Sequence, residues 1–567
     1  MQIISRYCFL LYSLFFIVQA SCAQPLHQKG GFTKQDTLRG SITPERAWWD
    51  VASYNIYVAP DYKNRSLKGW NDISFDINSD GKNRLMQIDL QQPMVIDSII
   101  FNKKKIKTFI RNGNVYLVDF GNFKFTAART LVKKEKAIPL HSIRIYFHGK
   151  PVVAKRPPWD GGWIFEKDAE GRPWMTVACQ GLGASVWYPC KDYQGDEPDL
   201  GATIQVKVPD TLVAVANGRL VKEEKLNGGF KLFEWQVKNP INNYNIVPYI
   251  GKYVHWSETY SGETGKNLSL DYWVLDYNLA KSKKQFGRDV NPMLKAFEYW
   301  FGPYPFYEDG FKLVESSHLG MEHQSATAYG NHYMNGYLGS DLSGSGWGLK
   351  WDYIIIHEAG HEWFGNNITT NDIADMWVHE GFTMYSEVLF VEYHYGKKAA
   401  DEYCRGIREN ISNDKPLIGP YAVNQEGSGD MYNKGANLLH TIRQVLNDDS
   451  LFRKILRGLN KDFYHKTVNT KDVEDYFSKQ SGKDLSKIFD QYLRTIKIPV
   501  LEYKIQGDNI SYRWNNCIEG FNMPVQLERS GEWLNPTTVW KQTTGTAALI
   551  SDFKINQNMY VTVKKVL

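Results

Sequence analysis

Residues 356–363 read Ile356-His357-Glu358-Ala359-Gly360-His361-Glu362-Trp363, an H-E-x-x-H motif inside an apolar run that contains no proline. This pattern predicts a buried helix. Two histidines four residues apart are separated by about 40° around a helix of 3.6 residues per turn, so His357 and His361 can share one metal ion. Glu358 lies beside that face, where a carboxylate can accept a proton from a metal-held water. The alternative is a helix whose two histidines bind no ligand.

A second stretch, residues 375–383, reads Asp-Met-Trp-Val-His-Glu-Gly-Phe-Thr and begins a helical pattern that continues to about Tyr395. Its Glu380 can supply an oxygen ligand, and two nitrogens with one carboxylate leave the fourth zinc position open, as in catalytic sites. Glu387 follows seven residues later on nearly the same face, where it could orient a ligand histidine or lie in solvent. His379 would point about 100° away from Glu380, so we do not expect it to be a ligand.

Four motifs, of which the zinc motif has two parts, resemble in this order those of the gluzincin zinc aminopeptidases of the aminopeptidase N family. They are Gln180 with Trp187-Tyr188-Pro189-Cys190-Lys191-Asp192, then Gly320-Met321-Glu322-His323, then the zinc motifs His357-x-x-x-His361-Glu362-Trp363-Phe364-Gly365-Asn366 and Trp377-x-x-Glu380-Gly381-Phe382, and finally Tyr432-Asn433-Lys434-Gly435-Ala436. Two positions depart from the family: Leu319 replaces a glycine and His323 replaces an asparagine. We expect these differences to change the substrate subsite and to leave the metal site intact.

The resemblance implies a zinc-dependent aminopeptidase with one zinc ion per chain, held by His357, His361 and Glu380. Glu358 would act as the general base and then protonate the leaving amine. The resemblance alone suggests that the Tyr432 phenol donates a hydrogen bond to the tetrahedral oxyanion.

The same resemblance assigns the substrate α-ammonium to Glu322 and Gln180. Binding the chain end there would place the first peptide bond at the zinc, which defines an exopeptidase acting on peptide substrates. One alternative is a zinc endopeptidase or other metallohydrolase on the same helix. Another is a catalytically silent scaffold, which the presence of all three ligands and Glu358 disfavours.

The first 23 residues carry one basic residue, Arg6, and an apolar run from Cys8 to Val18 that small residues follow. This pattern predicts a secretory signal peptide, cleaved before Gln24, and therefore an exported protein, periplasmic or extracellular. Lipidation of Cys22 is the alternative. No later stretch approaches the eighteen apolar residues of a transmembrane helix.

The formal net charge of the whole chain is +5, and loss of Arg6 with the leader would leave +4. A charge this small on a chain of 567 residues does not indicate nucleic-acid or membrane binding. Lysine clusters such as residues 103–105 are expected to be solvated turns. Four cysteines remain after the leader, of which Cys179 and Cys190 can either form a disulfide or remain buried thiols.

The chain divides into five predicted parts, and its fold class is a multidomain α+β protein. Residues 1–23 are the leader, and residues 24–45 are polar and expected to be flexible. Residues 46–255 contain short alternating runs that predict a large antiparallel β domain, in which Gln180 lies. Such runs are Gln87–Leu90, Val95–Phe101, Val115–Val118, Ser142–Phe147, Thr203–Val208 and Phe230–Val237.

Residues 256–496 change to helical periodicity, which the resemblance identifies with a thermolysin-like catalytic domain. The predicted helices are Leu279–Phe301, Asp352–Gly365, Ala374–Tyr395, Gly435–Leu446 and Asp484–Leu493, with a strand at Phe311–Glu315. Residues 497–567 return to strands and predict a small β-sandwich-like module. The large helical C-terminal domain of the family is not expected, which would leave the cleft more open.

Overall fold

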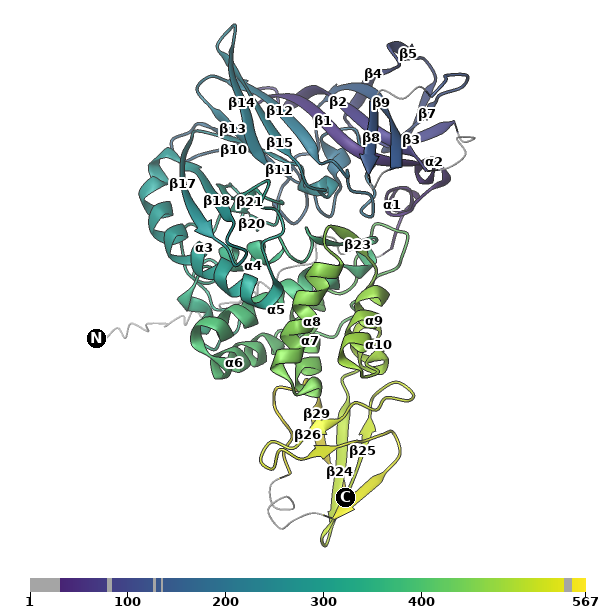
Figure 1. Cartoon of the computed structure of the whole chain (residues 1–567), viewed down its shortest axis with the longest axis vertical. Coiled ribbons are helices and arrows are strands. Elements are labelled where there is room, and N and C mark those ends of the chain that lie inside the picture. Colours follow the sequence, from purple (N-terminus) through teal and green to yellow (C-terminus); the bar gives the residue numbers. More distant parts are fainter. Residues whose placement is uncertain (1–30, 79–83, 126–128, 134–135, 545–552) are drawn as a thin grey trace, which may run out of the picture.

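The structure is a computed structural model that describes residues 31–567, apart from residues 79–83, 126–128, 134–135 and 545–552. The predicted leader, residues 1–23, lies outside the described residues. Figure 1 shows three regions along the longest axis: a β-rich region, a largely helical region and a small β region at the C-terminal end. In the described ranges, no helix is both long and apolar enough to cross a membrane.

The N-terminal region consists of strands joined mainly by short turns. Its strands are β1 (Trp49–Asp61), β2 (Ser66–Ile77), β3 (Leu85–Asp89), β4 (Val95–Phe101), β5 (Lys104–Ile106), β6 (Phe109–Asn112), β7 (Val115–Asp119), β8 (Arg129–Lys133), β9 (Lys136–Gly149), β10 (Gly162–Lys167), β11 (Pro173–Ala178), β12 (Ala202–Pro209), β13 (Val213–Ala216), β14 (Arg219–Leu226), β15 (Phe230–Val237) and β16 (Pro248–Gly251).

These strands form three sheets in the described part of the chain. The largest has nine strands in the order β14-β15-β12-β1-β2-β9-β4-β5, with β8 beside β9, and the others are β10-β11-β16-β13 and β3-β7-β6. Alternate side chains of β12 are buried, as the period-two pattern predicts. One pair departs from the antiparallel expectation: β1 and β12 are parallel, with Tyr54 opposite Ala202. This pairing is possible because a long connection returns the chain to the same edge.

Residues 33–47, which we call the N-terminal strap, form two short helices, so regular structure is present in part of the segment 24–45 that was expected to be flexible; residues 24–30 of that segment lie outside the described residues. They contain α1 (Lys34–Gly40) and α2 (Pro44–Ala47). Thr33 and Asp36 form a capping box at the start of α1. Arg46 is fully buried and donates a hydrogen bond of 2.7 Å to Asp89 on β3. A paired and buried arginine fixes the strap on the β domain, which a polar composition could not indicate.

The central region places helices against a five-stranded sheet of order β17-β18-β19-β21-β20. The strands of the sheet are β17 (Tyr253–Ser261), β18 (Asn267–Leu275), β19 (Phe311–Glu315), β20 (Gly320–Met321) and β21 (Thr327–Tyr329). Two further strands of the region, β22 (Ile368–Thr370) and β23 (Lys466–Val468), pair with each other. Its helices are α3 (Leu279–Phe301), α4 (Tyr353–Gly360), α5 (Trp377–Tyr395), α6 (Lys397–Arg408), α7 (Asn433–Leu446), α8 (Asp449–Asp462), α9 (Thr470–Ser481) and α10 (Ser486–Arg494). Residue 256, the predicted domain limit, lies inside β17.

The helix that carries the H-E-x-x-H motif is shorter than predicted. It ends at Gly360, and His361 is its C-terminal cap. The chain then turns, and Gly365 adopts a φ of 123°, which favours glycine. The amide of Gly365 donates to the Ile368 carbonyl at 2.9 Å, which closes the turn. The apolar run therefore extends beyond the helix because the turn itself is buried.

The C-terminal region contains β24 (Val500–Gln506), β25 (Asn509–Asn515), β26 (Val525–Gln526), β27 (Trp533–Leu534), β28 (Lys541–Thr544) and β29 (Thr562–Lys565). Four of these strands form one sheet in the order β28-β25-β24-β29. Its buried residues, including Trp514 and Phe521, belong to the same apolar core as the helices of the central region. The Tyr560 amide donates to the Thr441 hydroxyl on α7 at 2.9 Å, which also ties the two regions together.

Helices α5 and α7 meet at a pair of glycines. A methyl group added at Gly435 would lie 2.8 Å from the Cα of Gly381, and one added at Gly381 would lie 3.1 Å from the Cα of Gly435. Both distances are too short for ordinary side-chain contact, and backbone atoms cannot rotate away. The two glycines therefore set the separation of α5, which carries Glu380, from α7, which Tyr432 precedes.

We predict that Gly435→Ala destabilises the protein by about 1–3 kcal/mol, the usual effect of overpacking a core, even though alanine is the better helix former. Gly287→Ala is the matched control. Gly287 is exposed in α3 and has no atom within 4 Å of an added methyl group, so its substitution should stabilise by about 0.5–1 kcal/mol. The unfolding midpoints of the two variants and the wild type test this expectation. If Gly435→Ala unfolds at the same midpoint as Gly287→Ala, the close contact between Gly435 and Gly381 does not contribute to stability.

Candidate active site

The start of the zinc-motif helix is held by a buried carboxylate. Asp352 caps α4 by accepting a hydrogen bond from the Ile354 amide at 3.2 Å. It also accepts hydrogen bonds from Gln285, Tyr329 and Asn331 at 2.7 to 2.8 Å. Burial raises the pKa of the Asp352 carboxyl to about 7. The cap thus connects α4 to α3 and β21, which sets the direction in which the motif histidines point.

Three predicted ligands meet in space. The Glu380 Oε2 atom lies 3.3 Å from His361 Nε2 and 3.8 Å from His357 Nε2. Each of the three residues offers one donor atom within 4.8 Å of the others, so the group can hold a metal ion. All three side chains are buried. The sequence motifs on α4 and α5 therefore produce one compact set of two nitrogens and one oxygen.

The Nδ1 atom of each histidine has a hydrogen-bond partner, and the Nε2 atom of each histidine faces Glu380. His357 Nδ1 lies 2.6 Å from Glu387 Oε1, and the other oxygen of Glu387 accepts a hydrogen bond from Tyr403 at 2.6 Å. His361 Nδ1 lies 3.0 Å from the Phe364 carbonyl. Such partners fix the orientation of ligand histidines. Glu387 is thus buried against His357, the contact needed to orient that histidine, and the alternative of a solvent-exposed glutamate is wrong.

The donor set fits a zinc ion on its own chemistry. Among the described residues, none donates a hydrogen bond to Glu380 Oε2, although this oxygen is buried. Burial raises the pKa of the Glu380 carboxyl, but His361 and His357 outweigh burial and hold that pKa below its usual range. The group is therefore a buried carboxylate with one free oxygen facing two imidazoles. Two nitrogens and one carboxylate are a common protein ligand set for zinc with an open position.

Glu358 borders the same cavity without belonging to the three-ligand group. Burial raises the pKa of its carboxyl, while His357 and His361 oppose that shift. The carboxylate occupies its present position next to a residue without a side chain: a methyl group at residue 320 would lie 2.7 Å from Glu358 Oε1. The glycine of the Gly320-Met321-Glu322-His323 motif is thus explained by close approach of the glutamate of the zinc motif.

The Glu322 carboxylate forms the end of the site that faces the N-terminal region. Its Oε1 atom accepts hydrogen bonds from Gln180 Nε2 and, at 3.0 Å, from the Tyr244 hydroxyl. Glu322, Glu358 and His361 also form a group with oxygen and nitrogen atoms within 4.8 Å of one another. Gln180 and Glu322 therefore meet as the sequence motifs suggested, and both are buried.

Tyr244 is a functional candidate that the sequence analysis missed. It lies between β15 and β16 in a polar turn with no family motif, and its buried hydroxyl reaches Glu322 from the other side of the cleft. Burial, together with the Glu322 charge, raises the pKa of the Tyr244 phenol well above its usual value. Only the fold brings this turn to the site, so the sequence contained no local signal for it.

Tyr432 lies on the opposite wall. Its ring stacks on His357 with 6.0 Å between ring centroids, and it is almost fully buried. Burial and the neighbouring Glu380 raise the pKa of its phenol well above the usual value, so the hydroxyl stays protonated and can donate. His379 points elsewhere, because its Nε2 atom accepts a hydrogen bond from the Thr370 amide at 2.9 Å.

The two departures from the family motif take different positions. Leu319 lines the metal cavity, together with Pro158, Trp159 and Tyr337. His323 points away from it, because its Nδ1 atom bonds to the Tyr249 hydroxyl, which donates to the Ala326 carbonyl at 2.8 Å. We therefore expect Leu319, rather than His323, to affect the shape of the substrate subsite.

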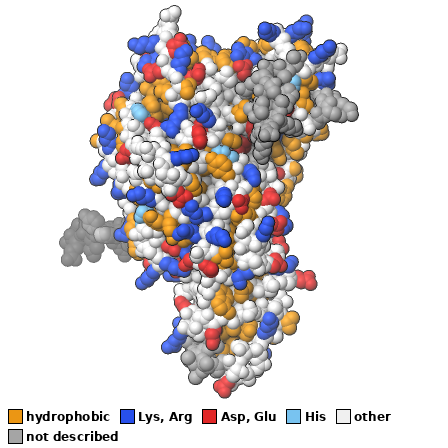
Figure 2. All heavy atoms as spheres, viewed as in Figure 1, with side chains coloured by type: hydrophobic (Ala, Val, Ile, Leu, Met, Phe, Trp, Pro, Cys, Tyr) orange, Lys and Arg blue, Asp and Glu red, His pale blue; other side chains and the backbone are white. Residues whose placement is uncertain are grey.

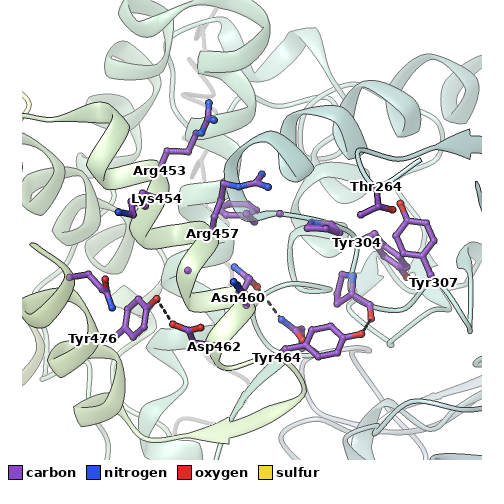
Figure 3. A pocket seen from close by; sticks show the side chains of 18 of the residues that line it. Thr264, Tyr304, Tyr307, Arg453, Lys454, Arg457, Asn460, Asp462, Tyr464 and Tyr476 are labelled. Carbon is purple, nitrogen blue, oxygen red and sulfur yellow. Dashed lines mark hydrogen bonds between the residues drawn. The ribbon is translucent and has the colours of Figure 1, made fainter. Parts of the chain in front are cut away.

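The cavity at the three ligands has a volume of about 70 Å³. A larger hollow of about 970 Å³ lies elsewhere, between the end of α3 and α8 (Figure 3). Tyrosines and basic side chains line that hollow, among them Tyr304, Tyr464 and Arg457, and none of the lining residues belongs to a metal-capable group of the described chain. Size alone therefore does not identify the reactive site, whereas the donor chemistry does.

Comparison with known proteins agrees with this geometry. Residues 288–492 match the Peptidase family M1 domain. The chain is 22% identical over 390 residues to Aminopeptidase M1 of Arabidopsis thaliana and 21% identical over 507 residues to Probable aminopeptidase 2 of Sulfurisphaera tokodaii. The alignments cover 66% and 85% of this chain but only 42% and 59% of those relatives.

Among solved structures, the M1 zinc metallopeptidase of Deinococcus radiodurans is similar in fold. A variant of it superposes with a TM-score of 0.65 at 19% identity, covering 80% of this chain and 96% of the other. The predicted multidomain α+β fold, with an N-terminal β domain before a helical catalytic domain, is therefore confirmed. The sequence motifs and the family comparison agree, because residues 288–492, which contain the predicted metal motifs, match the Peptidase family M1 domain.

Proposed function

We propose that this protein is a zinc-dependent aminopeptidase that removes N-terminal residues from peptides. One observation carries the proposal: the donor set of His357, His361 and Glu380 lies in one cavity with the Glu358 and Glu322 carboxylates. The first carboxylate suits a proton acceptor, and the second suits a binding site for a substrate ammonium. The relatives named as aminopeptidases support the proposal, as does the Deinococcus radiodurans enzyme, which was solved with a Tyr-Ser-Ala substrate.

His357, His361 and Glu380 would hold the zinc ion. When bound there, zinc supplies a Lewis acid that polarises a carbonyl and lowers the pKa of water. Glu358 accepts the proton of the attacking water and passes it to the leaving amine. Its raised pKa, caused by burial, suits a carboxylate that must both take and return a proton.

Tyr432 donates a hydrogen bond from its hydroxyl to the oxygen that becomes negative when the carbonyl is attacked. The hydroxyl remains protonated because burial and Glu380 raise its pKa. A donor that meets charge formed only in the transition state is typically worth a few kcal/mol. The alternative role, a tyrosine that only packs in the core, would leave the catalytic rate nearly unchanged.

Glu322 binds the substrate α-ammonium, and Gln180 and Tyr244 hold the carboxylate in place. Both neighbours donate to the same oxygen, Oε1. The second oxygen of the carboxylate remains for the ammonium, which gives a charge-assisted hydrogen bond. A fixed distance between this carboxylate and the metal ligands allows only one residue before the cleaved bond. An endopeptidase on the same metal site is the competing function, and it would need no free amine.

We also propose that the protein is exported, because the first 23 residues have the composition of a signal peptide. Cleavage before Gln24 gives a periplasmic or extracellular protein, and lipidation of Cys22 would give an anchored one. The proposed functional parts are the β domain at 46–255, the peptidase domain at 256–496 and the β module at 497–567. Figure 2 shows basic and acidic side chains interspersed over the visible face, in keeping with a small net charge.

The protein purified without added metal should contain one zinc ion per chain, because one three-ligand set with an open position is proposed. Glu380→Ala should lose most of the metal. Glu402→Ala, which removes a carboxylate outside the cavity, should retain it. Elemental analysis of the three proteins tests this expectation. Two tightly bound zinc ions, or full activity without any, would contradict the assignment.

Glu358→Gln should retain the metal and the fold but lower kcat by about 100-fold or more, since an amide keeps the shape and cannot accept a proton. The measurement is steady-state turnover of an aminoacyl fluorogenic amide, with metal content and the unfolding midpoint as controls. A kcat close to that of the wild type would show that another group acts as the base.

Glu322→Ala should lower kcat/KM for a peptide with a free N-terminus by roughly 10- to 150-fold, the value of a hydrogen bond to a charged group. Acetylation of the substrate amine should have a similar effect on the wild type. The two changes should not add, because each removes the same interaction. If the wild type cleaves the acetylated peptide as fast as the free one, the endopeptidase alternative is correct.

A further inference from the structure

The loop that carries Gln180 is held in place by side chains from distant segments. The Gln180 carbonyl accepts a hydrogen bond from Arg39 Nη2 at 3.2 Å. The Gly181 carbonyl accepts from Arg39 Nη1 at 2.6 Å and from Asn424 Nδ2 at 3.2 Å. The Leu182 carbonyl accepts from Gln91 at 2.6 Å. Three successive carbonyl groups are thus positioned by side chains, and the orientation of this loop depends on them.

Arg39 makes more of these contacts than the other two side chains. It lies on α1 of the N-terminal strap and is only 20% exposed. Its Nε atom lies 3.4 Å from Asp192 Oδ2, and its Nη1 atom also donates to the Asn424 side chain. The space is tightly filled, because a methyl group added at Gly183 would lie 2.5 Å from Arg39 Nε. The guanidinium therefore has one well-defined position.

The same arginine joins the loop to the catalytic region. Asn424 donates its backbone amide to the Asp36 carbonyl of α1 at 3.0 Å. A methyl group added at Gly40 would lie 2.2 Å from the Val423 carbonyl carbon, so α1 contacts this segment directly. Tyr421 in turn donates to Asp375 at 2.7 Å, just before the helix that carries Glu380.

We propose that Arg39 is a positioning residue for the amine-binding end of the active site. It fixes the backbone of Gln180 relative to the catalytic region, so that the side-chain amide of Gln180 remains hydrogen-bonded to Glu322 Oε1. The N-terminal strap is then part of the functional unit, although it lies outside residues 288–492, which match the family domain. Arginine suits this role because its planar group donates in several fixed directions at once, which a lysine ammonium cannot do. The proposal rests on the aminopeptidase function proposed above.

The kinetic test compares Arg39→Met and Arg39→Lys with a matched control, Arg172→Met. Arg172 has a similar exposure, 23%, and three carboxylate partners, Asp168, Glu170 and Asp276. Arg39→Met should raise KM for an aminoacyl amide with a free amine about tenfold and change kcat less, because a ground-state contact to the amine is disturbed. Arg39→Lys should restore little of this loss. Arg172→Met should leave both constants unchanged.

Measuring Arg39→Met together with Gln180→Ala distinguishes an effect on the position of Gln180 from a general effect on the structure. Gln180→Ala removes the group that Arg39 is proposed to position, so Arg39→Met should add less than a twofold change in that background. If Arg39→Met raises KM equally in both backgrounds, or lowers only the unfolding midpoint, the proposal is wrong.

Hydrogen exchange provides a readout that does not depend on activity. The amide of Gly183 donates to the Cys179 carbonyl at 2.6 Å, and Trp187 donates to Ala184 at 3.2 Å. Amides of residues 179–187 should exchange faster in Arg39→Met than in the wild type or in Arg172→Met. Unchanged exchange would overturn the proposal even in an active enzyme. If exchange is faster in Arg39→Met but the wild type cleaves no aminoacyl amide, the proposed function is wrong, whereas the proposed contact between Arg39 and the Gln180 loop is supported.

Discussion

A buried carboxylate facing two buried imidazoles is the constraint on which the rest of the site depends. Removing Glu380, His357 and His361 from water is unfavourable unless each polar atom finds a partner. Glu387, Tyr403 and the Phe364 carbonyl satisfy the outer atoms. The free oxygen of Glu380 and the inner nitrogens are left facing one another, which is the arrangement that a divalent cation stabilises.

Close contacts at glycines set the positions of the helices and side chains that form the site. Gly381 and Gly435 bring α5 and α7 together, and Gly320 gives the Glu358 carboxylate its space. A methyl group at any of these positions would come within 3.1 Å of a neighbouring atom, so the neighbour would have to move. Gly320, Gly381 and Gly435 therefore matter for close packing, whereas Gly365 of the zinc motif matters for its positive φ.

The two ends of the cleft come from different parts of the chain. The metal ligands and Tyr432 belong to the helical region, whereas Gln180 and Tyr244 approach Glu322 from the β domain. Arg39 and Asn424 then bind the Gln180 loop from two further segments. The proposed amine-binding end therefore lies at the interface between regions, whereas the proposed metal site is formed by two neighbouring helices.

The sequence by itself predicted that His357 and His361 share one helix face with Glu358 beside it, because helical periodicity places residues three or four apart on one face, and its motifs named Glu380 as the third candidate ligand. It also determined α3 at Leu279–Phe301 and the strand at Phe311–Glu315, since their apolar patterns end at clear turn signals. It did not determine where α4 ends, because a buried turn is as apolar as a helix. Only the tertiary structure decided the contacts of Tyr244 and Arg39 and the position of the strap. Their contacts join residues far apart in the chain, and no local pattern records a hydrogen bond whose two partners are brought together by folding.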